Sequence, residues 1–243
     1  MSLVVLSFLL APSSYAVCTY NIALPIEKNG LRHSKLQNMS RDSLVYMLTA
    51  FVKTNSALKV QTEMLRVNCE AVSDEAQSVF AELSEMSSYL EVYSRLKQFL
   101  KTGAYLRAQK IRHPDFFLGT QLSVLEKELD FKSWQNRIVA LSKVKGKKRV
   151  LYHSPNGMPE MSIAQTVENE GVIRETEVIL KREDNSGHYD FYAYDKDGKP
   201  TNESIFFNAQ NKNVVGPVPH TCMSCHYDGR TRTFQADPAS FHQ

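Results

Sequence analysis

Apolar residues recur at two spacings along the chain, and the change between them divides it in two. Residues 31–143 carry apolar positions three and four apart, which predicts amphipathic helices. Ser40 and Ser73 precede two of these runs, where a helix N-cap is favoured, and Gly103 stands where a helix would end. His113–Pro114 interrupts the next run. The apolar positions are Leu44, Val45, Leu48, Phe51 and Val52; Val79, Phe80, Leu83, Met86, Leu90, Tyr93 and Leu96; Leu122, Leu125 and Leu129; and Trp134, Ile138 and Leu141.

After the basic stretch Lys143–Arg149 the period approaches two, which predicts β-strands. The strand segments are Val150–Tyr152, Ser162–Val167, Val172–Leu180 and His188–Tyr194. Turn residues stand between or after them, at Asn156–Gly157, Asn185–Gly187 and Asp197–Gly198. The pattern predicts an α+β protein: a mainly helical region over 17–143, followed by a small antiparallel sheet over 144–243, with the boundary between about 130 and 148.

The first sixteen residues are typical of an export signal. Leu3–Leu10 is apolar except for Ser7, and Ser14-Tyr15-Ala16 follows as a small-residue cleavage site, so we expect cutting after Ala16. The apolar stretch is too short to span a bilayer, and no later stretch is long enough. The alternatives are a buried N-terminal element, or a lipoprotein with Cys18 as the lipidated residue. Val17 disfavours the lipoprotein, because a small residue is required there. We therefore expect a periplasmic or otherwise exported protein without a membrane span.

The composition narrows the class of protein further. The chain has 243 residues, of which 42% are hydrophobic and 23% charged, as in ordinary globular proteins. The formal net charge is +3, which is too small an excess to indicate a nucleic-acid partner. The four cysteines are too few for a disulfide-built scaffold at this length.

A C-x-x-C-H motif near the C-terminus carries the candidate chemistry. Cys222-Met223-Ser224-Cys225-His226 is the attachment pattern of a c-type haem. Each thiol adds to one vinyl group of the porphyrin, and the two-residue gap lets the backbone reach both vinyl groups. The imidazole of His226 then falls where it can ligate the iron. The motif therefore predicts one covalent haem c, with Cys222 and Cys225 as thioether residues and His226 as the proximal iron ligand.

Two other interpretations of the motif stay open. A zinc site would need two further ligands, and His220 and His242 flank the motif at irregular spacing. A plain disulfide or redox dithiol is the other alternative, but the strand–helix–strand unit of thioredoxin-like proteins is not predicted here. The expected export favours haem over both.

The opposite side of the iron is less determined by the sequence. A methionine or histidine there would make a low-spin electron carrier, whereas an open side would allow small-molecule chemistry. The candidate sixth ligands are His153, His188, Met158 and Met161, and an open side is the expectation. The aromatic residues of the last predicted strand alternate across both faces, so one face is a candidate wall for the haem; they are Tyr189, Phe191, Tyr192 and Tyr194.

The remaining cysteines and the basic cluster each have two interpretations. Cys18 and Cys69 would lie in an oxidising compartment, so we expect a disulfide that ties the mature N-terminus to the helical region; two free or modified thiols are the alternative. The basic cluster is expected to be a solvated linker, with a docking patch for an acidic redox partner as the alternative. Its members are Lys143, Lys145, Lys147, Lys148 and Arg149.

With these pieces in place, the C-terminal part resembles the exported mono-haem cytochromes of the c-prime-beta type and their relatives that oxidise hydroxylamine with a lysine-cross-linked haem. The matching pieces are Gly171–Leu180, Tyr189–Lys199, Cys222–His226 and Phe234, within about residues 130–236. The resemblance implies a largely antiparallel sheet, with the thioether roles for Cys222 and Cys225 and the proximal role for His226. The cross-linking lysine has no match, because Thr176 or a neighbour occupies its position and Lys181 is displaced.

Three functions are compatible with these features. The predicted one is a periplasmic mono-haem cytochrome that passes electrons to a redox partner. The second is an enzyme that acts at an open iron on a small nitrogen or oxygen species such as NO or hydroxylamine. The third is a gas-binding haem sensor with the helical region as its interaction surface. An enzyme would need a distal acid or base, and the nearby carboxylates are Glu168, Glu170, Glu175 and Glu177.

Overall fold

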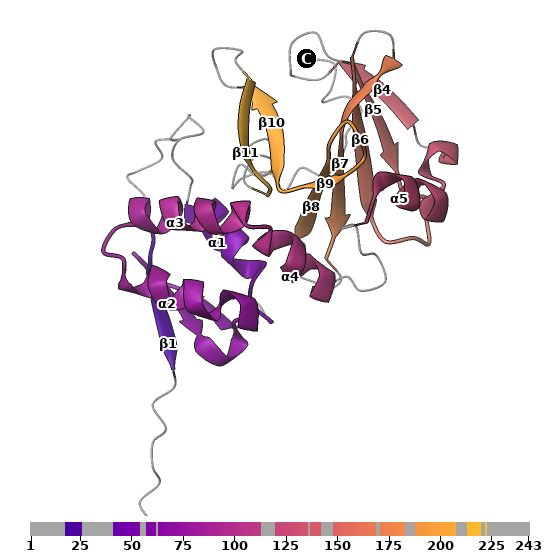
Figure 1. The fold of residues 1–243 in the computed structure, drawn as a ribbon. Helices are drawn as coiled ribbons and strands as arrows, with labels where there is room; N and C mark the ends of the chain where they lie inside the picture. Colours follow the sequence, from indigo (N-terminus) through magenta and orange to yellow (C-terminus); the bar gives the residue numbers. More distant parts are fainter. Residues whose placement is uncertain are drawn as a thin grey trace, which may run out of the picture.

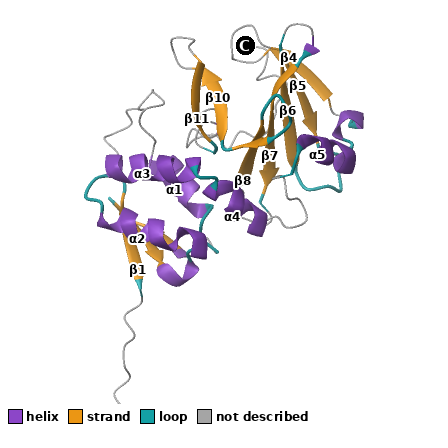
Figure 2. Ribbon diagram, viewed as in Figure 1, coloured by secondary structure: helices purple, strands orange, loops and turns teal. Residues whose placement is uncertain are grey.

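The computed structural model describes residues 18–25, 41–53, 57–61, 63–112, 120–135, 137–141, 148–168, 171–182, 188–207, 213–219 and 222. The fold is α+β, as the sequence predicts. Helices and a small sheet form the N-terminal region, and a larger antiparallel sheet follows (Figure 1). Figure 2 shows this division by secondary structure. The predicted signal segment, residues 1–16, lies outside the described residues.

The N-terminal region contains more strand than the sequence predicts. Its elements are β1 (Thr19–Ala23), α1 (Arg41–Thr49), β2 (Leu58–Val60), β3 (Met64–Asn68), the 3-10 turns η2 (Cys69–Ala71) and η3 (Asp74–Ala76), α2 (Gln77–Glu85), α3 (Tyr89–Lys101) and α4 (Ala104–Arg112). The strands pair antiparallel in the order β1-β3-β2. The helical interpretation of Leu58–Val60 and Met64–Asn68 is therefore wrong. In β3, Leu65 and Val67 are buried while Met64 and Arg66 are exposed, but this alternation is too short to stand out in the sequence.

The predicted helical stripe from Val79 to Leu96 is divided between α2 and α3. The break comes at Met86–Ser88, and a capping box begins the second helix. The backbone N–H of Glu91 donates to the Ser88 hydroxyl at 3.4 Å, and the Glu91 carboxylate accepts from the Ser88 N–H at 3.0 Å. As predicted, Gly103 stands at the end of α3, with a positive φ of 80° that suits glycine.

The C-terminal region is built on six described strands that pair antiparallel in chain order, here called the large sheet. Its elements are α5 (Leu122–Leu129), η4 (Phe131–Ser133), β4 (Arg137–Leu141), β5 (Lys148–His153), β6 (Met161–Val167), β7 (Ile173–Lys181), β8 (Tyr189–Tyr194) and β9 (Pro200–Thr201). Strands β10 (Glu203–Phe207) and β11 (Asn213–Pro217) form a separate hairpin. The strands predicted from the period-two segments are present as β5 to β8.

Strand β4 corrects another expectation. Trp134, Ile138 and Leu141 continue the helical spacing in the sequence, but Arg137–Leu141 pairs along its whole length with β5. The positive φ of Asp130, 44°, ends α5 in the left-handed conformation. Backbone pairing with β5, rather than the local apolar spacing, thus decides the structure of this segment.

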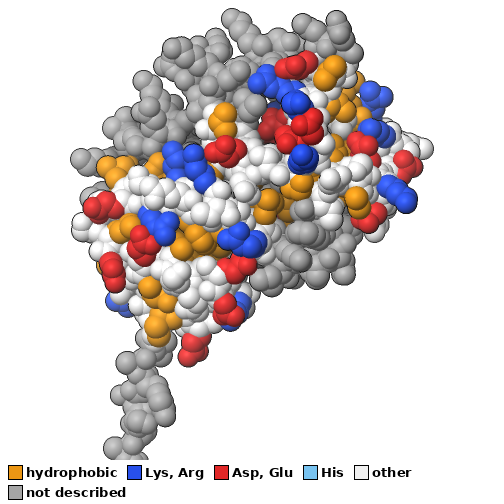
Figure 3. Space-filling view, in the orientation of Figure 1, with side chains coloured by type: hydrophobic (Ala, Val, Ile, Leu, Met, Phe, Trp, Pro, Cys, Tyr) orange, Lys and Arg blue, Asp and Glu red, His pale blue; other side chains and the backbone are white. Residues whose placement is uncertain are grey.

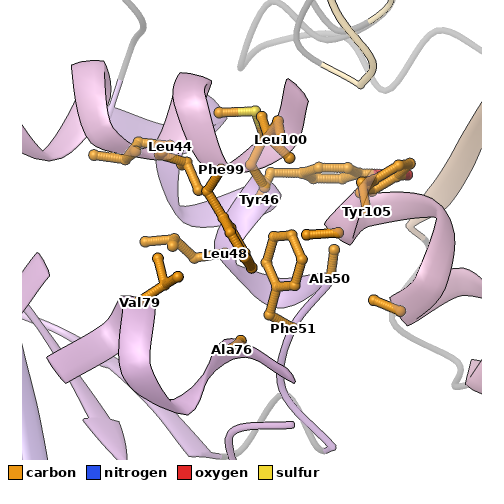
Figure 4. Close-up of a cluster of buried hydrophobic side chains, with 14 of the residues drawn as sticks. Leu44, Tyr46, Leu48, Ala50, Phe51, Ala76, Val79, Phe99, Leu100 and Tyr105 are labelled. Atoms are coloured by element: carbon orange, nitrogen blue, oxygen red, sulfur yellow. The ribbon is translucent and has the colours of Figure 1, made fainter. Parts of the chain in front are cut away.

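Two buried clusters form the core. The first fills the N-terminal region, where Leu44, Leu48, Phe51 and Phe99 come together (Figure 4). It extends to the large sheet and the chain after β11, through Ile179, Phe191, Ala193, Val218 and Cys222. The second packs α5 and η4 on the large sheet. The N-terminal region therefore shares its core with one face of the large sheet.

Candidate haem-attachment site

The two faces of the large sheet differ in what covers them, and we name them after neighbouring residues of β8. The Tyr192 face is covered by α5 and η4, with Phe131 packed edge-on against Tyr152 at a ring-centroid distance of 5.2 Å. Its members are Val150, Tyr152, Met161, Ile163, Val178, Leu180, Tyr192 and Tyr194. These residues form an apolar core, with buried Gln165 and Thr176 beside them on the same face, and burial raises the pKa of the Tyr194 hydroxyl.

The Phe191 face carries a mixture of polar and apolar side chains. Residues that are partners across neighbouring strands lie on the same face, and the register joins His153 to Ser162, Ser162 to Ile179 and Ile179 to Phe191. The members are Arg149, Leu151, His153, Ser162, Ala164, Thr166, Glu175, Glu177, Ile179, Phe191 and Ala193. Strands β6 and β7 thus carry buried residues on both faces, although the Phe191 face includes polar side chains.

Cys222, the first residue of the C-x-x-C-H motif, lies on the Phe191 side. Its side chain is 6% exposed and belongs to the same buried cluster as Ile179, Phe191 and Ala193. Strand β11 ends five residues earlier at Pro217, so the hairpin leads the chain to this position. Cys225 and His226 lie outside the described residues. The structure therefore places the start of the motif but not the two residues expected to complete it.

The residues present fit a covalent haem. Two thiols and an imidazole are the donor set that the group requires, and Cys222 belongs to a buried, largely apolar cluster of the kind that can cover a porphyrin. Within the described ranges, no three histidine, cysteine, aspartate or glutamate side chains gather as a metal site. The zinc alternative therefore depends on His220 and His242, which lie outside those ranges.

A polar cluster occupies the Phe191 face over β5, β6 and β7. Arg149 Nη1 lies 2.8 Å from Glu177 Oε2, with side chains 19% and 12% exposed, and the Ser204 hydroxyl of β10 donates to Glu177 Oε1 at 3.2 Å. Thr166 and Glu175 are buried beside them, and the hydroxyl of Thr166 has no hydrogen-bond partner in the described part of the chain. The cluster offers hydrogen-bonding groups on the same face as Cys222.

Arg149 also corrects the interpretation of the basic cluster. It pairs with Glu177 and is half-buried, so it belongs neither to a solvated linker nor to a docking patch. Lys148 is exposed, and residues 143–147 lie outside the described part of the chain.

The four candidate sixth ligands are separated by the fold. Met161 is buried in the core of the Tyr192 face, and Met158 packs against that core. The ring of His188 lies 4.4 Å from that of Tyr46, at the joint with the N-terminal region. Only His153, among these four, lies on the Phe191 face with Cys222.

The other residues singled out from the sequence also have defined places. Glu168 is an exposed partner of Arg174, at 3.1 Å, and Glu170 lies outside the described residues. Thr176 is buried on the Tyr192 face, where the Gln165 amide donates to it at 3.4 Å. Lys181 pairs at the surface with Glu160, at 2.6 Å.

A buried ion pair was missed by the sequence analysis. Arg182 Nε donates to Asp190 Oδ1 at 2.7 Å, and Gln109 of α4 donates to the same oxygen at 2.8 Å. Burial alone would lower the pKa of the Arg182 guanidinium, but Asp190 and neighbouring tyrosines outweigh it and raise the pKa. An aspartate inside an apolar strand is the only sequence signal for this pair, because its partners come from elements far apart in the chain.

Cys18 and Cys69 are joined by a disulfide bond, with their Cα atoms 5.4 Å apart. The bridge ties the residue before β1 to the first residue of η2, and the Cys69 N–H also donates to the Cys18 carbonyl at 3.2 Å. The disulfide predicted between Cys18 and Cys69 is thus present in the structure.

The surface in Figure 3 carries interspersed acidic and basic side chains rather than a field of one sign. Among the described helices, none has the length and apolar character needed to cross a bilayer.

No family model matches the chain, and no curated protein or solved structure is significantly similar to it.

Proposed function

We propose that the protein is an exported c-type cytochrome that holds one covalent haem at the Phe191 face and transfers electrons to a redox partner. The observation that carries the proposal is that Cys222 is buried in the same apolar cluster as Ile179, Phe191 and Ala193 of the large sheet. The first thiol of the motif thus belongs to the core that includes apolar residues of one sheet face.

The residues of the motif would hold the group in distinct ways. The S–H of Cys222 and that of Cys225 would each add across one vinyl double bond, forming a C–S and a C–H bond with no net oxidation. The imidazole of His226 would give its lone pair to the iron. When bound, the haem supplies a one-electron couple between ferrous and ferric iron. Phe191 and Ala193 exclude water from the adjoining surface, which favours the less charged state of any bound centre.

Export and family relationship are parts of the same proposal. The Cys18–Cys69 bridge suits an oxidising compartment such as the periplasm, and residues 1–16 supply the predicted signal. The antiparallel strands β5 to β8, which precede the motif, support a relationship to the c-prime-beta and hydroxylamine-oxidising cytochromes.

Acid–acetone extraction of the exported, matured protein tests the attachment. We expect the colour to stay with the polypeptide, whose intact mass includes one haem. Cys222→Ala with Cys225→Ala should abolish both. The matched control removes the other two cysteines, Cys18→Ala with Cys69→Ala, and should keep the haem. Colour that passes to the solvent, or a colourless matured protein, would refute the proposal.

A small-molecule haem enzyme or gas-binding sensor is the second candidate, favoured by the polar cluster on the same face. Glu177 is held by Arg149 and Ser204, and the hydroxyl of Thr166 is buried without a partner in the described residues. Such groups are suited to hydrogen-bond a small nitrogen or oxygen ligand. A high-spin spectrum that shifts with NO or CO would support this function, whereas a low-spin spectrum unchanged by CO supports the electron carrier.

A further inference from the structure

His153 has an unusual hydrogen-bonding environment at the end of β5. Its Nδ1 lies 2.9 Å from the hydroxyl oxygen of Ser162 on the neighbouring strand. Its Nε2 is buried and has no hydrogen-bond partner among the described residues. A buried polar atom without a partner lowers stability, because its hydrogen bond to water is lost and not replaced, so such atoms call for an explanation.

The chemistry of this arrangement suits a metal ligand. The Ser162 hydroxyl can accept from Nδ1–H, and in that tautomer Nε2 presents a lone pair. Histidine ligands commonly have the second ring nitrogen bound in this way, which orients the ring. Burial lowers the pKa of His153, so the imidazole is neutral at neutral pH.

His153 also lies on the Phe191 face, the face whose residues share a buried cluster with Cys222. Its row across the Phe191 face continues through Ser162, Ile179 and Phe191, and the last two share a buried cluster with Cys222. Strands lie about 5 Å apart, so β5 is roughly 10 Å from β7. The spacing from β5 to β7 is on the scale of a porphyrin ring, so a group held on this face can reach both strands.

We infer that His153 is the second axial ligand of the haem iron, with Nε2 as the donor atom and Ser162 as the residue that positions the ring. The inference rests on the proposed function and replaces the open side that the sequence favours. A histidine on each side of the iron makes a six-coordinate, low-spin centre, which suits electron transfer rather than binding of gases.

The absorption and electron paramagnetic resonance spectra of the matured holoprotein test this ligand. We expect low-spin ferric haem in the unmodified protein. His153→Ala should convert it to high-spin haem, and added imidazole should restore the low-spin form. His188→Ala is the matched control and should leave the spectrum unchanged. A high-spin unmodified protein, or a low-spin spectrum in His153→Ala without imidazole, would overturn the inference.

A second variant covers the case in which His153→Ala folds poorly. His153→Met keeps a ligand of similar length, and a thioether raises the reduction potential relative to imidazole. A potential equal to that of the unmodified protein would contradict axial ligation by residue 153.

The two proposals fail in distinguishable ways. Intact mass and the pyridine haemochrome of the denatured protein report haem attachment independently of the axial ligand. A protein without haem refutes the proposed function. A protein that keeps its haem but is high-spin leaves attachment intact and refutes only the role of His153.

Discussion

Arg182 and Asp190 form an ion pair of 2.7 Å inside the protein, with side chains 1% and 0% exposed. Arg182 Nη1 also donates to the Thr49 hydroxyl of α1 at 2.8 Å, and Gln109 of α4 donates to Asp190. Figure 1 shows α4 between the other N-terminal helices and β8. The pair therefore joins the N-terminal region to the large sheet, and loss of one charge would leave the other buried without compensation.

Asp190→Asn should lower the free energy of unfolding by about 3–5 kcal/mol, because the Arg182 charge stays buried. Urea denaturation of the matured protein measures the change. Asp197→Asn is the control, since Asp197 pairs with Lys196 at the surface with side chains 57% and 73% exposed, and it should cost less than about 1 kcal/mol. Equal effects of the two substitutions would contradict a stabilising role for the buried pair.

Ser88→Ala should lower the free energy of unfolding by about 1 kcal/mol, because it removes the acceptor at the start of α3. Ser123, an exposed residue of α5, offers the comparison. Alanine is the better helix former there, so Ser123→Ala should leave stability unchanged or slightly higher. Thermal or chemical denaturation of both variants checks the prediction, which a neutral Ser88→Ala would contradict.

Removal of the disulfide by Cys18→Ala with Cys69→Ala should lower the free energy of unfolding by about 4 kcal/mol in the chain-entropy model. The reason is the separation of 51 residues between the two cysteines, whose closure restricts the unfolded chain. Peptide mapping without reductant should recover the linked pair from the unmodified protein. Unlinked peptides, or a variant of unchanged stability, would argue against the bridge.

Glu160→Gln should lower the free energy of unfolding at neutral pH by about 0.5 kcal/mol, which is the typical contribution of an exposed ion pair. Hydrogen bonds from Lys181 and Tyr189 lower the pKa of Glu160 below its ordinary value of 4.5. The folded state thus holds the proton on Glu160 less tightly than the unfolded state does. The stabilisation that ionised Glu160 provides is therefore present above pH 4.5 and is lost as the pH falls through the lower folded pKa. Denaturation curves of both proteins should converge in acid; a constant difference would contradict this cause.

Local patterns predicted much of the secondary structure, and where they failed, pairing between distant segments decided the result. Strands β5 to β8 were predicted because each contains a short segment rich in β-branched, apolar or aromatic residues and is bounded by basic or turn residues. Strand β4 was not, since its apolar residues also fit a helix and only β5 selects the strand. Strands β2 and β3 were missed because they are short. They become strands by pairing with each other, and β3 also pairs with β1.

The sequence by itself supplied the C-x-x-C-H motif at Cys222, Cys225 and His226 on which the haem proposal rests, because that motif depends on spacing within five consecutive residues. It also determined which segments alternate strongly enough to become strands. Only the tertiary structure decided which sheet face meets Cys222, and it separated His153 from the other candidate ligands. The physical reason is register: a shift of one residue in strand pairing moves a side chain to the opposite face, and the pairing involves residues far apart in the chain.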